Sequence, residues 1–187
     1  MGNLFMENTL TLLSSLSPLL PVVLWIVIIA LIVVNVKNNV WETRRYKDDF
    51  GNFTKNFYIA LKKRGYGQFS NSATTGSLMN FNALIDIGDV SFRFFDYGEH
   101  PLKNTYSDRR TLDFKCQANN GVRLDTVVTV GGYSDDFALD REDSEKFIEM
   151  LKNSKKLKCI MEGGNLRYVF EVKNGNFKKL YKKLQSK

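Results

Sequence analysis

Two cysteines and one histidine are the side chains of this 187-residue chain that are best suited to nucleophilic chemistry or to binding a soft metal ion. Cys116 and Cys159 both fall on the apolar face of an expected strand, with 42 residues between them. The pattern favours two buried thiols that act as small hydrophobic groups. The alternative is a Cys116–Cys159 disulfide, which would stabilise the fold by roughly 3 to 4 kcal/mol. Neither cysteine has a CxxC neighbour or a nearby basic cluster, so no redox role is expected.

The histidine, His100, lies in the longest expected polar loop, Gly98 to Arg110, where we expect a solvated side chain. One histidine and two separated cysteines cannot supply a zinc site of the usual spacing. An acidic cluster lies in "SDDFALDRED"; its members are Asp135, Asp136, Asp140, Glu142 and Asp143. Calcium loops place oxygens at alternate positions and a glycine at the sixth, which this run does not do. Helix capping and first-turn acids account for the cluster, so no metal is expected.

None of the short catalytic motifs for phosphate, dinucleotide, hydrolase or metalloprotease sites occurs in the chain. We therefore expect no enzyme, no catalytic residue and no cofactor. Asn52-Phe53-Thr54 matches the glycosylation tripeptide, but such matches are common by chance and this one lies on an expected helix.

Lysines gather on the last expected helix, "NFKKLYKKLQSK". Residues 153–187 contain ten basic and two acidic residues, a net charge of +8, so the other 152 residues sum to −1. The lysines opposite the apolar stripe either form a solvated face or contact anionic lipid, at about 1 kcal/mol for each basic residue. These residues are Lys178, Lys179, Lys182 and Lys183. Nucleic acid is not expected as a partner because no aromatic stacking surface accompanies the lysines.

The stretch from Leu19 to Val36 is apolar except for Pro21 and Asn35. As a helix it would span about 27 Å, close to the thickness of a bilayer core. The sequence therefore predicts a transmembrane helix over residues 18–36 after a short tail, residues 1–17. A cleaved signal peptide does not fit, because residues 1–17 have no Lys or Arg and no small-residue cleavage site follows.

Basic residues flank this apolar stretch on its C-terminal side alone; they are Lys37, Arg44, Arg45, Lys47 and Lys55. Because positive flanks stay on the cytoplasmic side, the count favours a soluble domain in the cytoplasm over one in the periplasm. The expected localisation is an inner membrane, crossed once.

In the rest of the chain, the spacing of apolar residues changes from helical periodicity to strand alternation. Phe50, Phe53, Phe57 and Leu61 lie at helical spacing, which predicts a juxtamembrane amphipathic helix over residues 37–65. Residues 66–187 then form the soluble domain. Alternation between apolar and polar residues predicts three hairpins there, turning at 88–89, 119–121 and 163–164. Helices are expected after Asp140 and from Phe177. The predicted fold class is α+β: a transmembrane helix, then antiparallel hairpins packed with two or three helices.

Residues 110–184, about 40% of the chain, resemble the C-terminal part of small bacterial envelope domains. The features that match are "LDFKCQ", "SEKFIEMLKNSKKL", "CIMEGGNLRYVFEV" and "GNFKKLYKKL". The domains are those of the invasion-associated locus B family and of related accessory proteins of type VI secretion. Such domains are usually exported, and their cysteine often pairs with one near the C-terminus. The resemblance implies a bacterial membrane and brings no catalytic residues.

Two functions follow as expectations. The first is a single-pass, membrane-anchored, non-enzymatic interaction module with a protein partner. The alternative is an exported, disulfide-containing accessory factor of envelope assembly or secretion.

Overall fold

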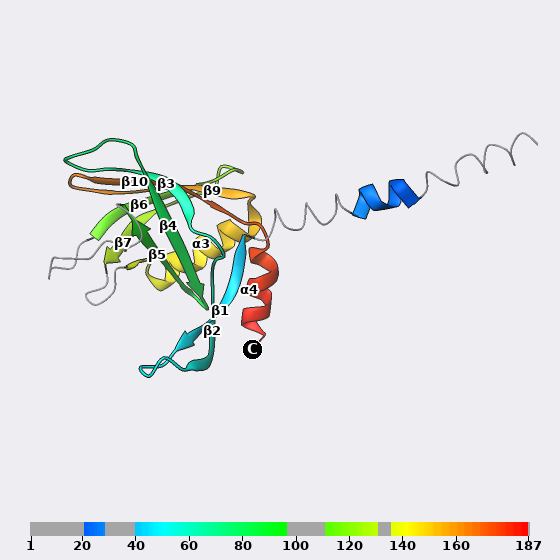
Figure 1. The fold of residues 1–187 in the computed structure, drawn as a ribbon. Coiled ribbons are helices and arrows are strands. Elements are labelled where there is room, and N and C mark those ends of the chain that lie inside the picture. The colour runs from blue at the N-terminus through cyan, green and yellow to red at the C-terminus, as the bar shows by residue number, and fades with distance from the viewer. Residues whose placement is uncertain (1–20, 29–39, 97–110, 131–135, 187) are drawn as a thin grey trace, which may run out of the picture. The chain divides into compact units, whose positions relative to one another are not determined.

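The computed structural model describes residues 21–28, 40–96, 111–130 and 136–186 (Figure 1). The chain divides into two compact units, Met1–Asn38 and Asn39–Lys187. In the first unit, residues 21–28 are helical. The second unit contains all the strands of the described residues and carries the candidate site.

Ten strands of the second unit form one antiparallel sheet. They are β1 (Trp41–Lys47), β2 (Phe53–Leu61), β3 (Gly65–Ser70), β4 (Ser77–Asp86), β5 (Asp89–Phe95), β6 (Thr111–Ala118), β7 (Arg123–Val130), β8 (Asp136–Ala138), β9 (Lys156–Gly163) and β10 (Leu166–Lys173).

The sheet closes on itself. Its strand order is β1-β2-β4-β3-β10-β9-β6-β7-β8-β5, and β5 also pairs with β4, so eight strands form a closed sheet. The two remaining strands, β1 and β2, join this closed sheet where Ile59 and Ala60 of β2 pair with Ile85 and Leu84 of β4. β1 therefore stands at the end of the strand order, beyond β2 (Figure 1).

Two helices complete the second unit: α3 (Arg141–Asn153) and α4 (Phe177–Gln185). Asp140 is the N-cap of α3, where its side chain accepts a hydrogen bond from the backbone N–H of Asp143 at 2.8 Å. α3 contacts β5, β7 and β9, and α4 contacts α3, β1 and β2. Both helices bury one face and expose the other.

Aromatic rings fill the core. The fully buried ring of Phe92 lies 5.5 Å from the ring of Phe114, 5.5 Å from that of Phe147 and 5.3 Å from that of Phe170. These rings come from β5, β6, α3 and β10. One side chain of β5 thus packs against two other strands and the helix, at distances typical of favourable aromatic pairs.

The first strand is attached to the beginning of the last helix. The side-chain amide of Asn176 accepts a hydrogen bond from the backbone N–H of Trp41 at 2.8 Å and donates one to the carbonyl of Trp41 at 2.8 Å. The indole N–H of Trp41 donates to the carbonyl of Lys173 at 2.8 Å. The Trp41 ring also packs on Phe177, with 5.2 Å between ring centroids. These contacts hold the two ends of the second unit together.

The predicted hairpins are confirmed, but the predicted α+β class is wrong. β4–β5, β6–β7 and β9–β10 pair as the alternation indicates, and α3 and α4 form where expected. Strands make up 54% of the structure, however, and eight of them close into one sheet. The extra strands are β1, β2, β3 and β8, which the sequence patterns did not predict.

The predicted helix over residues 37–65 is wrong because a turn interrupts it. The Asp48 carboxylate accepts hydrogen bonds from the backbone N–H groups of Phe50 and Asn52 at 3.0 and 2.8 Å. Gly51 adopts a φ of 82°, in the left-handed region that glycine tolerates. Phe50 is 91% exposed, so the supposed apolar stripe is not a buried face. The compact unit also begins at residue 39, not at the predicted boundary at residue 66.

The predicted transmembrane helix over residues 18–36 is also corrected. Residues 21–28 are helical, whereas residues 18–20 and 29–36 lie outside the described residues. Within residues 21–28, 40–96, 111–130 and 136–186, no helix has both the length and the apolar composition needed to cross a bilayer. The prediction of a single-pass protein of an inner membrane is corrected with it.

Candidate functional site

A groove lies beside the first hairpin, with a volume of about 820 Å³. We call it the ribbon groove. Seven of its lining residues come from β1 and β2, and three come from β4, β5 and β8. They are Thr43, Arg44, Arg45, Tyr46, Lys47, Phe53, Tyr58, Leu84, Arg93 and Asp136. Four of the ten are basic, three are aromatic and one is acidic.

The groove exists because the first hairpin extends beyond the sheet. β2 pairs with β4 through Ile59 and Ala60, whereas residues 53–57 of β2 pair with β1. The strand register shifts between Arg45 and Lys47, and such irregularities bend a hairpin and increase its twist. The projecting hairpin is visible at the lower end of the molecule in Figure 1.

The charge of the groove is only partly neutralised. The Arg93 guanidinium donates two hydrogen bonds to the Asp136 carboxylate, at 2.6 and 2.8 Å. Arg44 donates to Glu42 at 2.7 Å. Arg45 lies over the ring of Phe57 at 5.2 Å, and Lys47 lies over a second phenylalanine ring of β2 at 5.3 Å.

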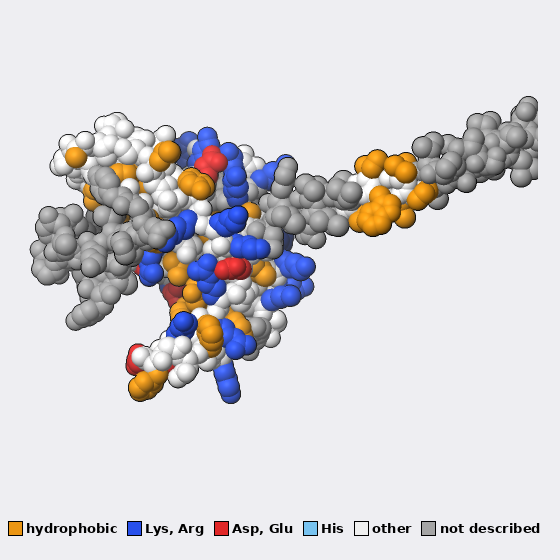
Figure 2. All heavy atoms as spheres, viewed as in Figure 1, with side chains coloured by type: hydrophobic (Ala, Val, Ile, Leu, Met, Phe, Trp, Pro, Cys, Tyr) orange, Lys and Arg blue, Asp and Glu red, His pale blue; other side chains and the backbone are white. Residues whose placement is uncertain are grey.

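Arg45 and Lys47 have no carboxylate partner within the described part of the chain. Two exposed positive charges are therefore available to a ligand. Figure 2 shows the face that includes the first hairpin, where Lys and Arg side chains outnumber acidic ones.

The tyrosines of the groove are held in place by each other and by β4. The rings of Tyr46 and Tyr58 lie 4.7 Å apart. The Tyr46 hydroxyl donates a hydrogen bond to Asp86 at 2.7 Å. Burial, followed by this hydrogen bond, raises the pKa of Tyr46 above its ordinary value of 10.0. Tyr46 is thus a neutral phenol at physiological pH and adds no negative charge to the groove.

A second hollow, of about 460 Å³, lies on β3, β6, β7, β9 and β10. Its charged lining residues are mixed: Lys115, Arg123, Asp125, Lys158 and Glu171. Lys115 is already paired with Glu162 at 2.7 Å. Because cations and acids nearly balance there, the ribbon groove is the better candidate for binding an ionic partner.

The two cysteines lie opposite each other on neighbouring strands. Cys116 of β6 and Cys159 of β9 are register partners, both are buried, and the structure joins their sulfurs in a disulfide. The sequence favoured two thiols because the basic flank of the apolar stretch predicted a cytoplasmic domain, where thiols stay reduced. A disulfide is what the alternative of an exported factor would need.

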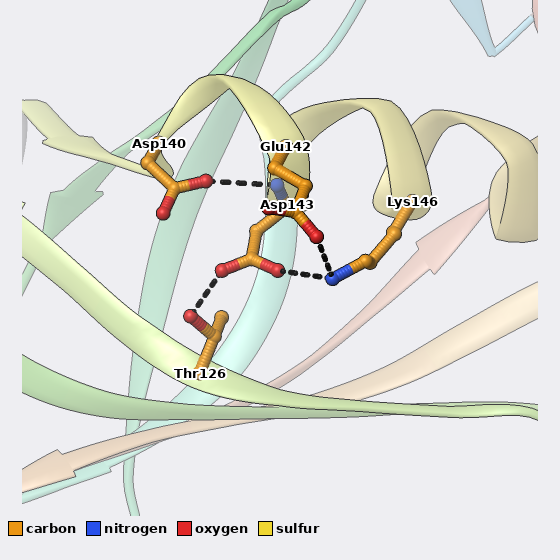
Figure 3. A network of polar contacts seen from close by, with 5 residues as sticks. All are labelled: Thr126, Asp140, Glu142, Asp143 and Lys146. Atoms are coloured by element: carbon orange, nitrogen blue, oxygen red, sulfur yellow. Dashed lines mark hydrogen bonds and ion pairs between the residues drawn. The ribbon is translucent and has the colours of Figure 1, made fainter.

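The other residues that the sequence singled out have structural roles where they are described. His100 and Asp135 lie outside the described residues. Asp143 accepts hydrogen bonds from the Thr126 hydroxyl and from Lys146, and Glu142 pairs with Lys146 at 2.8 Å (Figure 3). This network attaches the first turns of α3 to β7. Among the described residues no group of His, Cys, Asp and Glu could hold a metal ion.

The lysines of α4 are placed as the helical spacing indicates. Phe177, Tyr181 and Leu184 are buried, and the opposite face is exposed. The exposed lysines are Lys178, Lys179, Lys182 and Lys183, none of which lines the ribbon groove. Contact of these lysines with anionic lipid stays a prediction.

One buried carboxyl is incompletely satisfied. Asp96, which follows β5, is 7% exposed, and its Oδ2 accepts a hydrogen bond from the Tyr168 hydroxyl at 3.3 Å. Its Oδ1 has no hydrogen-bond partner among the described residues. Burial raises the pKa of Asp96 to about 6, from an ordinary value of 3.8.

This raised pKa predicts a pH-dependent stability. Because the folded state prefers the protonated carboxyl, the contribution of Asp96 is fully present below about pH 4 and is lost as the pH rises to about 6. We expect Asp96→Asn to raise the free energy of unfolding by about 2 kcal/mol at neutral pH, and by far less near pH 4. Urea unfolding over this pH range measures the difference. An equal effect at both ends would contradict the assignment.

Sequence reasoning missed the ribbon groove. Arg44, Arg45 and Lys47 were counted only as flanking charges, and Phe53 was assigned to a helix face. The usable signal was a tyrosine within a cluster of three basic residues along residues 44–47, beside a turn at Asp48 to Gly51.

Comparison with known proteins adds no assignment: no protein-family model, curated protein or solved structure matches the chain. The resemblance of residues 110–184 to bacterial envelope domains stays a prediction.

Proposed function

We propose that the chain is a non-enzymatic interaction module that binds an anionic segment of a protein partner in the ribbon groove. The observation that carries this proposal is the presence of Arg45 and Lys47, two exposed cations without carboxylate partners in the described residues, beside aromatic side chains. A carboxylate-rich ligand would supply the partners that these cations lack.

The surroundings of the two cations support binding without chemistry. Their closest rings, Phe57 and Phe53, orient the charged groups without neutralising them. The Arg93–Asp136 pair joins β5 to β8, and the Tyr46–Asp86 hydrogen bond joins β1 to β4. The groove thus offers positive charge on strands that are held together by these contacts. Such preorganised charge favours specific association and faster encounter with an acidic partner.

The test is the affinity of the full-length protein for a short fluorescein-labelled oligoglutamate peptide, measured by fluorescence anisotropy at low ionic strength. We expect the double variant Arg45→Gln, Lys47→Gln to weaken binding about tenfold, because two unscreened charge contacts are lost. Added salt should weaken binding by the wild type more than by this variant.

The matched control is Lys178→Gln, Lys179→Gln, which removes the same charge from α4, outside the groove. We expect this control to retain wild-type affinity within about twofold, because neither lysine lines the groove and a peptide bound there would not contact them directly. Equal losses in the two double variants would mean that overall charge, and not the groove, binds the peptide. That result would contradict the proposal.

A further inference from the structure

The strand that supplies half of the groove lining, β1, has a second feature: it has an open edge. β1 stands at the end of the strand order, with β2 on one side. Thr43 and Arg45 are exposed. An unpaired strand edge presents backbone donors and acceptors that can bond an added strand.

The hydrogen bonds of Trp41 show which backbone groups point outward. Its N–H and carbonyl are both bonded to the Asn176 side chain rather than to β2. Alternate residues of an antiparallel strand direct their backbone groups to the same edge. Thr43 and Arg45 therefore present their N–H and carbonyl groups on the side that Asn176 occupies at Trp41.

Nothing in the described part of the chain bonds these outward groups. No hydrogen bond to the backbone of Thr43 or Arg45 occurs there apart from the pairing of β1 with β2. Asn176 acts as a one-residue partner at the beginning of the edge. The N–H and carbonyl groups of Thr43 and Arg45 come next, and no described residue beyond β2 bonds them.

We infer that an extended acidic segment of a protein partner adds to β1 as a further strand, bonded to the backbone of Thr43 and Arg45. This inference rests on the proposed function and specifies how the ribbon groove is used. Main-chain hydrogen bonds would supply the affinity, and the side chains of the edge would supply the selectivity.

The charges of the edge determine which strand fits. Successive side chains of a strand point to opposite faces, so Arg44 lies on one face and Arg45 on the other. An acidic side chain on the Arg45 face would meet a cation without a carboxylate partner among the described residues, whereas Arg44 on the other face is already paired with Glu42. A second copy of β1 would instead bring its own Arg44, Arg45 and Lys47 close to these three residues of the first copy. Opposed like charges destabilise strand pairs. The edge thus disfavours self-association and favours an acidic partner.

The decisive variant is Thr43→Pro in the full-length protein, with Thr43→Val as its matched control. Proline removes the outward N–H and is tolerated on an edge strand whose N–H faces solvent. Valine keeps the N–H and the strand preference. We expect Thr43→Pro to weaken oligoglutamate binding about fivefold or more, and Thr43→Val to change it less than about twofold.

A second measurement needs no variant. Amide hydrogen exchange, followed by NMR on the wild-type protein, should slow about tenfold or more at Thr43 and Arg45 when oligoglutamate saturates the protein. Exchange at Glu42 and Arg44, which face β2, should change little. This comparison decides the matter if Thr43→Pro does not fold.

The outcomes separate the two proposals. If the peptide binds Thr43→Pro as well as wild type and protects neither amide, strand addition is overturned, while loss of binding in Arg45→Gln, Lys47→Gln would still support the groove. If an oligothymidylate of equal charge binds more tightly than oligoglutamate and protects neither amide, the partner is a nucleic acid and strand addition is overturned. If neither probe depends on Arg45 and Lys47, both proposals fail.

Discussion

Phe92→Ala should lower the free energy of unfolding by about 4 kcal/mol, the loss typical of a fully buried phenylalanine. The Phe92 ring contacts Phe114, Phe147 and Phe170, so its removal leaves a cavity between three strands and α3. The structure around such a gap relaxes only partly, so most of the lost contacts are not recovered. Urea denaturation of the full-length protein, followed by far-ultraviolet circular dichroism, measures the loss.

Two controls define this prediction. Phe92→Leu keeps most of the volume and should cost about 1 to 2 kcal/mol. Val127→Ala on β7 changes a side chain that is 50% exposed, and its effect should stay below about 1 kcal/mol. If Phe92→Ala were no worse than Phe92→Leu, the ring would not be the centre of the core that the structure describes.

Loss of the Cys116–Cys159 disulfide should lower the free energy of unfolding by about 3 to 4 kcal/mol. The bond closes a loop of 43 residues in the unfolded chain, and opening it restores conformational freedom to that state. The double variant Cys116→Ser, Cys159→Ser and the reduced wild-type protein both test this. The reduced protein isolates the bond itself, since serine also adds buried hydroxyl groups.

The control for reduction is the double serine variant treated with the same reductant, whose stability should not change. The thiols should also resist a maleimide in the folded, non-reduced protein and react once it is reduced and unfolded. Rapid labelling of the folded, non-reduced protein would show free thiols. Such a result would contradict the bond and weaken the alternative of an exported factor.

The sequence predicted the local pairings well because these depend on neighbours in the chain. Gly88, Gly121 and Gly164 all adopt positive φ at the predicted turns, and each turn joins the two strands that alternate on either side of it. Asp140 caps α3 because its carboxylate reaches a backbone N–H three residues later. Such features need no knowledge of the rest of the fold.

The closure of the sheet could not be predicted in the same way. β3 pairs with β10 and β6 pairs with β9, and neither pairing is set by a turn. β3 also has a weak strand signal, since its sequence, GYGQFS, includes two glycines. These glycines are needed for close packing: a Cβ at Gly65 would lie 2.3 Å from the Phe81 ring, and one at Gly67 would lie 2.7 Å from the carbonyl of Val169.

The candidate groove was missed for a related reason. The groove around Arg45 and Lys47 depends on residues from elsewhere in the fold. Phe57 and Phe53 lie across the hairpin, and Arg93 and Asp136 belong to other strands. The predicted helix over residues 37–65 placed these basic residues and aromatic rings along a single continuous helix. The turn at Gly51 was the local signal that should have outweighed the spacing of the phenylalanines.

The contact between Trp41 and Asn176 has a consequence for biosynthesis. The ribosome makes β1 before the groups that fix it, because Lys173 and Asn176 follow Trp41 by 132 and 135 residues. β3 must likewise wait for β10 before the ring of strands can close. A nascent chain that stops short of these residues keeps its aromatic interior uncovered, and such chains are substrates for chaperones. This domain should therefore reach its native state only once residues 166–176 have emerged from the ribosome.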